Sequence, residues 1–172
     1  MDLDPLMRRF VLALALLGCT PCLAEPLTGP ATVVDGDTLD LHGTRVHLYG
    51  IDAPEAGQVC ENAAGRSYPC GNEATRLLRK RIGEGPVTCE PHKPDAKGRL
   101  TATCKAGGDD LSAWLVSQGY ALASRTVTPA YVRHEAHAWA TRKGIWAGTF
   151  EPPADWRHDH RRREATADPA TH

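Results

Sequence analysis

Acidic side chains are dense in one short stretch near the start of the chain. Asp35, Asp37 and Asp40 lie close together, and Asp52 and Glu55 follow an intervening apolar run. Strands rarely carry so many carboxylates for folding alone, because acids are poor strand formers and like charges repel. Acids held on paired strands can surround a hard divalent cation, which takes carboxylate and carbonyl oxygens as ligands. The residue types therefore predict a metal-ion site.

Two apolar runs, Thr32–Leu41 and Arg45–Ile51, have the composition of β-strands and must position these acids. The dipeptide His42-Gly43 between them is short enough for a tight hairpin turn. In this interpretation the first three acids lie on the first strand, and the last two directly follow the second strand. A two-stranded hairpin would then carry the whole acidic group.

The length and charge of the chain limit the classes of protein it can belong to. It has 172 residues, enough for one domain with a hydrophobic core. Its formal net charge of −1 excludes a protein whose whole surface is basic. Any nucleic-acid substrate must therefore be held by local positive charges rather than by an overall basic field.

Residues 1–24 have the features of a secretory signal peptide. Two arginines precede the apolar run Phe10–Leu17, and a small residue ends the segment at a cleavage position. The run is too short to span a bilayer, and prolines soon after it disfavour a buried helix. We therefore expect export to the periplasm or to the outside of the cell. Cys19 lies in a loose lipoprotein box, which leaves lipid anchoring open.

Removal of that segment leaves four cysteines, an even number that indicates disulfides in an exported chain. Of the possible pairings we favour Cys60–Cys70 together with Cys89–Cys104. The second pair lies on two expected strands, with the centre of the connecting loop midway between the two cysteines, so they can face each other. A four-cysteine zinc site is the alternative, and it is disfavoured because no C-x2-C pair remains.

Further helices and strands are expected after the acidic hairpin. Apolar periodicity and capping residues predict helices over Asn72–Ile82, Leu111–Gln118 and Pro129–Lys143, and strands over Val87–His92, Arg99–Lys105 and Tyr120–Ala123. Asn72 and Asp110 are the expected caps of the first two helices. This order fits the α+β class, with a five-stranded OB-fold β-barrel and three α-helices. We expect one domain over residues 25–150 and a flexible C-terminal tail over 151–172.

Four short motifs are spread along the chain. They are V-D-G-D-T at 34–38, L-Y-G-I-D-A-P-E at 48–55, D-A-K-G-R at 95–99 and G-I-W at 144–146, with Pro152 and Trp156 after the last. In this order they closely resemble the thermonuclease family, the staphylococcal-nuclease-like enzymes, in its exported bacterial form. The resemblance implies an OB-fold barrel, calcium binding and hydrolysis of phosphodiester bonds in DNA and RNA.

The resemblance also implies roles for individual residues. By position, Asp37 and Asp52 are the expected calcium carboxylates, and Ala53 would give its backbone oxygen, which makes a set of hard oxygen ligands. Glu55 would orient or deprotonate the attacking water. Asp35 is expected to contact the metal ligands without binding the ion itself, or to act only as a turn former. A nucleic acid is the expected substrate, and because no stable protein partner is implied, we expect a monomer.

One position departs from the family pattern. Hydrolysis of a phosphodiester builds negative charge on the oxygens bound to phosphorus. The family stabilises this charge with two arginines, and Arg99 matches one of them. The position of the other is His47, and an imidazole is shorter than a guanidinium and makes no two-pronged contact with phosphate. Arg45 lies on the same strand face as His47, and the sequence does not decide whether Arg45 can contact the phosphate.

Two function hypotheses follow from these observations. The favoured one is a secreted, calcium-dependent nuclease whose turnover is weakened or pH-shifted by His47. The alternative is a catalytically poor OB-fold module that binds nucleic acid or another anion. We favour the enzyme because a protein that only binds has no need to keep the metal acids, Glu55 and Arg99 together.

Overall fold

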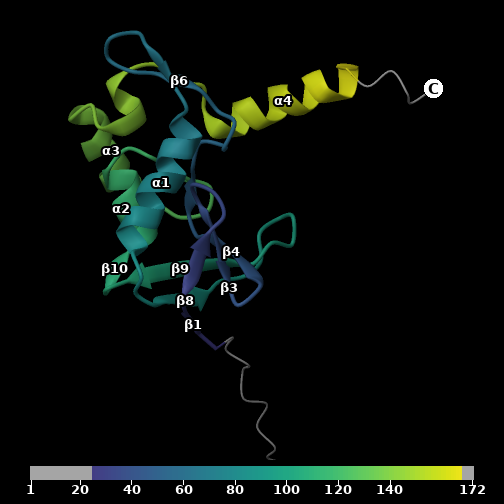
Figure 1. Cartoon of the computed structure of the whole chain (residues 1–172), viewed down its shortest axis with the longest axis vertical. Coiled ribbons are helices and arrows are strands. Elements are labelled where there is room, and N and C mark those ends of the chain that lie inside the picture. Colours follow the sequence, from purple (N-terminus) through teal and green to yellow (C-terminus); the bar gives the residue numbers. More distant parts are fainter. Residues whose placement is uncertain (1–24, 168–172) are drawn as a thin grey trace, which may run out of the picture.

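A computed structural model describes residues 25–167 of the chain. The predicted signal peptide and Cys19 lie outside the described residues, as do the last five residues of the predicted tail, 168–172. Within residues 25–167, no helix is long and apolar enough to cross a membrane. The α+β class expected from the order of elements is confirmed, with one main sheet at one end of the molecule and helices packed at the other (Figure 1).

The main sheet has seven strands and is mixed. Its order is β1 (Leu27–Gly29), β8 (Val87–Pro91), β9 (Thr101–Ala106), β4 (Thr44–Leu48), β3 (Thr38–Leu41) and β2 (Ala31–Val33), with β10 (Asp109–Asp110) also paired to β9. Neighbouring strands are antiparallel except β4 and β9, which are parallel with His47 opposite Thr101. This parallel pairing brings the loop before β9 to the same end of the sheet as the acidic hairpin.

The first expected strand, Thr32–Leu41, is divided in two. β2 ends at Val33 and β3 begins at Thr38, so Asp35 and Asp37 lie in the turn between them and not on a strand. The Asp35 carboxylate accepts a hydrogen bond of 3.1 Å from the Asp37 amide, which stabilises a turn in place of strand pairing. The second expected turn, at His42-Gly43, is confirmed, since both residues adopt positive φ angles between β3 and β4.

Two small strand pairs complete the β structure. The second expected strand, Arg45–Ile51, is interrupted after β4, and its end forms β5 (Ile51–Asp52), which pairs with β11 (Leu122–Ala123). The other pair is β6 (Cys60–Glu61) with β7 (Ser67–Tyr68). The five expected strands are thus all present, in shortened or divided form, and the short strands β1, β6, β7 and β10 are additional to them.

Three helices occur where they were expected. They are α1 (Cys70–Ile82), α2 (Leu111–Ser117) and α3 (Val132–Ala140), and a 3-10 turn follows over Gly144–Ala147. The predicted cap Asn72 is wrong, because α1 begins two residues earlier, after Pro69. The predicted cap Asp110 is confirmed, since its carboxylate accepts a 3.1 Å hydrogen bond from the Ala113 amide.

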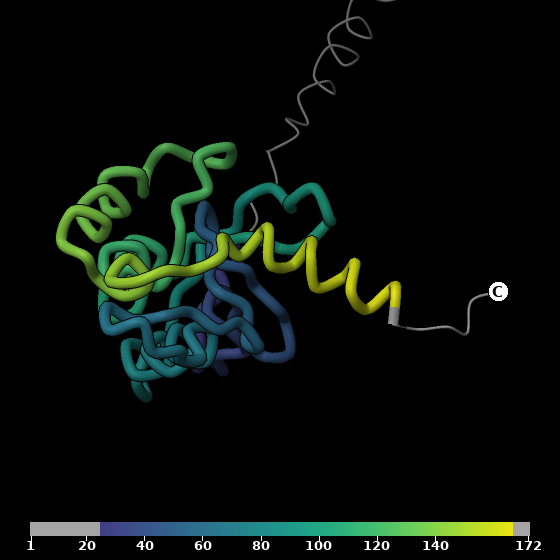
Figure 2. The backbone as a smooth tube through the Cα atoms, turned by 90° about the horizontal axis from the view of Figure 1, so that it is seen from above, coloured from purple at the N-terminus to yellow at the C-terminus, as the bar shows by residue number. Residues whose placement is uncertain are grey.

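The sequence predicted a flexible tail over residues 151–172, and a fourth helix, α4 (Pro153–Ala167), forms in this segment. The helix has no apolar stripe, which is why periodicity did not reveal it. Pro153 is fully buried at its first position, where proline is favoured, and the Trp156 ring lies beside Gly57. Only the first part of α4 contacts the body, and its second half extends away from the domain (Figures 1 and 2).

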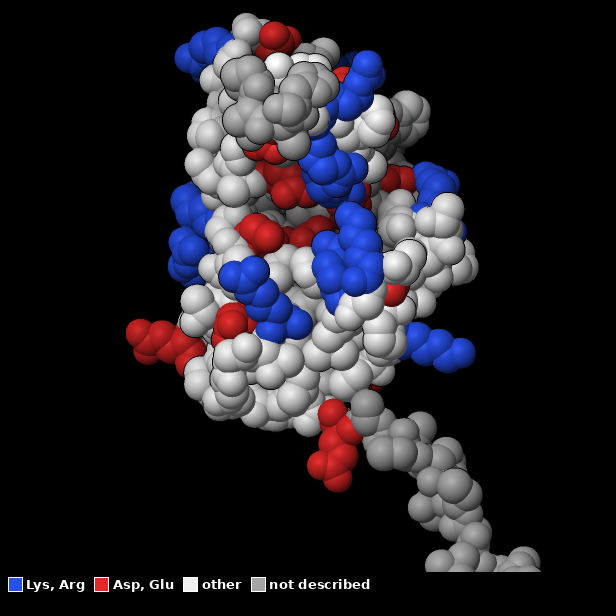
Figure 3. Space-filling view, turned by 90° about the vertical axis from the view of Figure 1, so that its right-hand side faces the viewer, with Lys and Arg blue, Asp and Glu red and all other residues white. Residues whose placement is uncertain are grey.

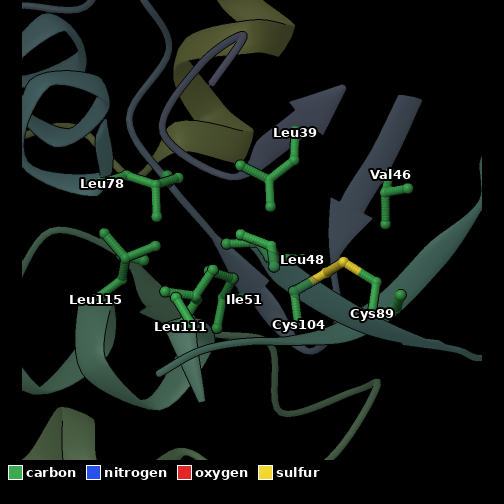
Figure 4. Packing of buried hydrophobic residues seen from close by; sticks show 14 of the residues in the cluster. Leu39, Val46, Leu48, Ile51, Leu78, Cys89, Cys104, Leu111 and Leu115 are labelled. Carbon is green, nitrogen blue, oxygen red and sulfur yellow. A yellow bond between two sulfur atoms is a disulfide. The ribbon is translucent and has the colours of Figure 1, made fainter. Parts of the chain in front are cut away.

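The core lies between the sheet and the first two helices. Leu39 from β3 packs with Leu78, Leu111 and Leu115 from α1 and α2, and all four are completely buried (Figure 4). Both predicted disulfides, Cys60–Cys70 and Cys89–Cys104, are confirmed. The second lies inside this core, because its two cysteines are directly opposite each other on β8 and β9. The first ties the loop after the acidic stretch to the start of α1.

Candidate active site

A cavity of about 550 Å³ opens at the end of the sheet where the two hairpins meet. Its charged lining residues are the acids Asp35, Asp37, Asp52, Glu55 and Asp95 and the basic side chains His47, Lys93, Arg99 and Arg157. On the side of the molecule from which α4 projects, acidic side chains gather in a hollow with basic side chains beside it (Figure 3). The sequence-predicted site residues therefore converge on one place, although they come from distant parts of the chain.

Asp37 is fixed by hydrogen bonds from two neighbouring segments. Its backbone oxygen accepts a 2.8 Å hydrogen bond from the Leu48 amide at the end of β4. Its Oδ2 atom accepts a 3.0 Å hydrogen bond from the Ala53 amide, which follows Asp52. The turn between β2 and β3 is therefore tied to the strand that carries the second acidic group. This contact brings the predicted metal ligands Asp37, Asp52 and Ala53 close together.

His47 faces Asp37 across the β3–β4 pair, where Thr38 is its register partner. The His47 Nδ1 atom lies 3.0 Å from the Thr38 hydroxyl and 3.9 Å from Asp37 Oδ1. Burial raises the pKa of Asp37, but contacts from His47 and the Ala53 amide outweigh it, so that its pKa lies below the ordinary value. Asp37 is thus held as a carboxylate, and one edge of the His47 ring is engaged with it.

Asp35 differs from Asp37 in its electrostatics. Burial raises the pKa of Asp35, and the negative charge of Asp37 raises it further. Two carboxylates this close repel each other, so the ionised form of Asp37 disfavours the ionised form of Asp35. Of the two, Asp37 is therefore the one that its neighbours hold as a carboxylate.

Glu55 is positioned by a residue that the sequence did not reveal. Gln58 is completely buried; its side-chain oxygen accepts a 3.2 Å hydrogen bond from the Glu55 amide, and its own amide donates to the Glu55 carbonyl at 2.8 Å. The Gln58 side-chain nitrogen donates to the Glu151 carbonyl at 2.6 Å. A glutamine in a polar loop gives no sequence signal for burial. Here it joins the Glu55 loop to the segment before α4.

Arg99 reaches the cavity from the turn before β9. The Asp95 carboxylate accepts hydrogen bonds from the amides of Lys97 and Arg99, both at 2.9 Å, and from Arg99 Nε at 2.6 Å. Partial burial raises the pKa of Asp95, but these bonds outweigh it and lower its pKa to about 2. The Arg99 guanidinium keeps its terminal nitrogens without partners among the described residues, so they are available to an anion.

Arg157 is the second site residue that sequence reasoning missed. Its Nη1 atom donates to Asp52 Oδ1 and to Glu55 Oε1, each at 2.7 Å, and its Nη2 atom donates to Asp52 Oδ2 at 3.0 Å. The hydrogen bonds that Arg157 donates to the carboxylates of Asp52 and Glu55 raise the pKa of Arg157 despite its partial burial. Its signal in the sequence is indirect, because Arg157 directly follows the Trp156 of the C-terminal motif.

The donor atoms in this cavity fit a hard divalent cation. Asp37 and Asp52 both line the cavity and would supply carboxylate oxygens, which calcium takes as ligands together with carbonyl oxygens and water. Among residues 25–167, no three acidic, histidine or cysteine side chains converge on a single point as a metal site. In the structure the Arg157 guanidinium provides the positive charge for Asp52 and Glu55.

An OB-like mixed sheet, helices on one side and a cavity that combines carboxylates with guanidinium groups define the staphylococcal-nuclease class of proteins. A family model described as Staphylococcal nuclease homologue matches residues 45–148, which is more than half of the chain. The chain belongs to this family. The matched segment includes His47, Asp52, Glu55 and Arg99, whereas Asp37 lies before it.

Individual relatives agree with this assignment. The chain is 37% identical over 139 residues to the succinoglycan biosynthesis protein ExoI of Rhizobium meliloti, covering 79% of this chain and 73% of that protein. It is 31% identical over 120 residues to the probable staphylococcal-like nuclease CAN3 of rice, Oryza sativa, covering 68% of this chain and 29% of that protein. It is 31% identical over 114 residues to the probable endonuclease LCL3 of Candida glabrata, covering 59% of this chain and 43% of that protein.

Family membership supports a nuclease kind of hydrolytic activity, with nucleic acid as the substrate class and calcium as the metal that the family generally uses. The two disulfides indicate an oxidising compartment. Arg45, the arginine on β4, is not among the residues that line the cavity. The second guanidinium near the acids comes instead from Arg157 on α4.

Proposed function

We propose that this protein is an exported, calcium-dependent nuclease that hydrolyses phosphodiester bonds of DNA or RNA. The observation that carries the proposal is the convergence of Asp37, Asp52, Glu55 and Arg99 on one cavity from three separate segments of the chain. A general base, a guanidinium and a hard-cation donor set are the parts that phosphodiester hydrolysis needs.

In this proposal Asp37, Asp52 and the Ala53 backbone oxygen hold the metal ion. When bound, calcium supplies positive charge against the negative charge that develops on the phosphate. The hydrogen bond from the Ala53 amide to Asp37 fixes the two segments relative to each other before any ion arrives. Little reorganisation of the backbone is then needed for binding.

Glu55 orients and deprotonates the attacking water, because a carboxylate at this position faces the cavity and has its backbone fixed by Gln58. Arg99 donates its terminal N–H groups to the phosphate oxygens, while Asp95 holds the Nε side of the same guanidinium. His47 lies beside Asp37 and helps to keep it ionised, and this role differs from that of a phosphate-binding arginine.

Export is supported by two independent features. Residues 1–24 have a signal-peptide composition, and the remaining four cysteines form two disulfides in the structure. A protein that folds with these bridges belongs in an oxidising compartment, which for this chain is the periplasm or the exterior of the cell. The expected substrate is therefore nucleic acid outside the cytoplasm.

The test is cleavage of single-stranded DNA and RNA by protein purified from the exported fraction, with calcium and with excess chelator. We expect cleavage that depends on calcium and stops on chelation. Tight binding of the oligonucleotide without cleavage at any calcium concentration would instead support the alternative, an OB-fold module that only binds nucleic acid. Failure to bind and to cleave would contradict both.

A further inference from the structure

Arg157 uses only one side of its guanidinium group to hold the acids. Three of its five N–H groups point to Asp52 and Glu55, two from Nη1 and one from Nη2. The remaining two, on Nε and Nη2, have no partner among residues 25–167. In the planar guanidinium these two N–H groups lie side by side and form a second fork, which matches two oxygens of a phosphate.

The position of this second fork is set by the residues at the start of α4. Gln58 links the Glu55 loop to the Glu151 carbonyl, and Pro153 is fully buried at the start of the helix. The Arg157 side chain is 30% exposed and lines the same cavity as Arg99. Because the acids hold one edge of the group, little conformational entropy is lost when the other edge binds a ligand.

We propose that Arg157 is a catalytic residue that binds the phosphate of the substrate with its Nε and Nη2 atoms. This inference deepens the proposed function and rests on it. The Nη1 atom of the same guanidinium is 2.7 Å from Glu55, so one planar group would hold the phosphate on one edge and the carboxylate that activates water on another. Arg157 thus serves as the second guanidinium of a cavity in which β4 contributes a histidine, His47.

The chemistry of the cavity favours this assignment over a purely structural ion pair. A structural pair needs only to neutralise Asp52 and Glu55, and an exposed ammonium group would do this equally well. Arg157 instead binds both oxygens of Asp52 with one fork and leaves the other fork unbonded at a partly exposed position. The unbonded pair of N–H groups has the geometry to bind a second anion.

The first experiment measures phosphate affinity without metal, and so does not depend on turnover. Thymidine 5′-monophosphate is titrated by calorimetry, in the presence of chelator, into the wild type, Arg157→Gln, Arg157→Lys and Arg161→Ala. Loss of one charged, bidentate contact should weaken binding by about tenfold in Arg157→Gln and by less in Arg157→Lys. Arg161→Ala, on the exposed part of α4, removes the same charge and should leave the affinity unchanged.

The second experiment measures turnover of single-stranded DNA with calcium, and it includes a rescue. Arg157→Gln should lower turnover by about a hundred- to thousandfold, the usual effect of losing a positioned charge donor. Adding His47→Arg to Arg157→Gln should recover at least about tenfold of that loss, because a guanidinium on β4 replaces the missing one. A merely structural role of Arg157 would not be repaired from another strand.

The outcomes separate this inference from the proposed function. Unchanged affinity for the nucleotide in both Arg157 variants would overturn the inference even if the wild type is an active nuclease. Faster cleavage by Arg157→Gln than by the wild type would also overturn it, since the arginine would then block Asp52 and Glu55. A wild type that never cleaves, with nucleotide binding that still depends on Arg157, would refute the nuclease and retain the phosphate site.

Discussion

Gly71, the second residue of α1, lies directly against the backbone carbonyl of Glu55. A Cβ atom built at position 71 would be 1.7 Å from the Glu55 oxygen, a distance that no structure tolerates. The adjacent Cys70 is bonded to Cys60, which fixes the helix start against the same loop. The helix and the loop that carries the proposed general base therefore meet without any space between them.

Gly71→Ala should displace Glu55 and lower both stability and turnover. Forcing a methyl group into a closed contact costs about 1–3 kcal/mol, and the disulfide prevents α1 from simply moving away. The free energy of unfolding in urea and the rate of DNA cleavage measure the two effects. Gly85→Ala is the matched control, because the built Cβ lies 3.9 Å from its nearest neighbour. Equal behaviour of the two variants would contradict the close contact.

Glu55→Gln should lower turnover by about a hundred- to ten-thousandfold, because the amide cannot accept a proton from water. Glutamine has the same size and still accepts a hydrogen bond from Arg157, so the fold and the affinity for calcium should change little. Steady-state cleavage and calcium titration by calorimetry distinguish the two properties. Glu73→Gln removes a half-buried carboxylate paired with Arg76, away from the cavity, and should cleave normally. Wild-type turnover of Glu55→Gln would assign the base to another residue.

Asp37→Asn should weaken calcium binding by at least about tenfold, since affinity for this ion depends on the number of charged ligands. Asparagine keeps one oxygen for the Ala53 amide, so the backbone contact is retained. The increase in melting temperature on adding calcium should therefore be lost, while the melting temperature with chelator stays near that of the wild type. Asp40→Asn, whose carboxylate caps the β3–β4 turn through Gly43, serves as the control. The idea fails if both variants bind calcium equally.

Asp95→Asn should remove part of the acid sensitivity of the protein. The pKa of Asp95 is lowered to about 2 in the folded state, below its ordinary value of 3.8. Such a carboxylate stabilises the fold above the unfolded-state pKa and loses this contribution as the pH falls from about 4 towards 2. Because Asp95 and Arg99 form a partly exposed ion pair, we expect the free energy of unfolding of the variant to be about 0.5–1 kcal/mol lower than that of the wild type at pH 7.

The dependence on pH is what identifies this contribution. Urea unfolding at pH 7, 4 and 3 should show a smaller fall in stability for Asp95→Asn than for the wild type. Glu90→Gln, which removes a single exposed contact with Lys105, should leave the wild-type pH dependence in place. Parallel stability curves for Asp95→Asn and the wild type would show that the turn does not depend on the ionised carboxylate.

Much of the fold and part of the site are visible in the sequence because they depend on neighbours along the chain. Apolar periodicity locates three helices, and the cysteines indicate both disulfides. The spacing of Asp37, Asp52 and Glu55 around two short strands points to one acidic site, and the D-x-x-G-R turn places Arg99 beside it. The breaks after Val33 and Leu48 were missed, because turn hydrogen bonds and alternative pairings compete with strand propensity over a few residues.

Only the tertiary structure places Gln58 and Arg157. Burial of Gln58 arises from contacts with Glu151, which is far away in the sequence, and nothing in its own neighbourhood indicates it. Arg157 reaches Asp52 and Glu55 because Pro153 and Trp156 pack the start of α4 against the domain, although this helix has no apolar stripe. The sequence by itself determined which acids are candidates for binding a cation. The packing of the chain decided which guanidinium lies against them, because that contact depends on long-range geometry and not on local pattern.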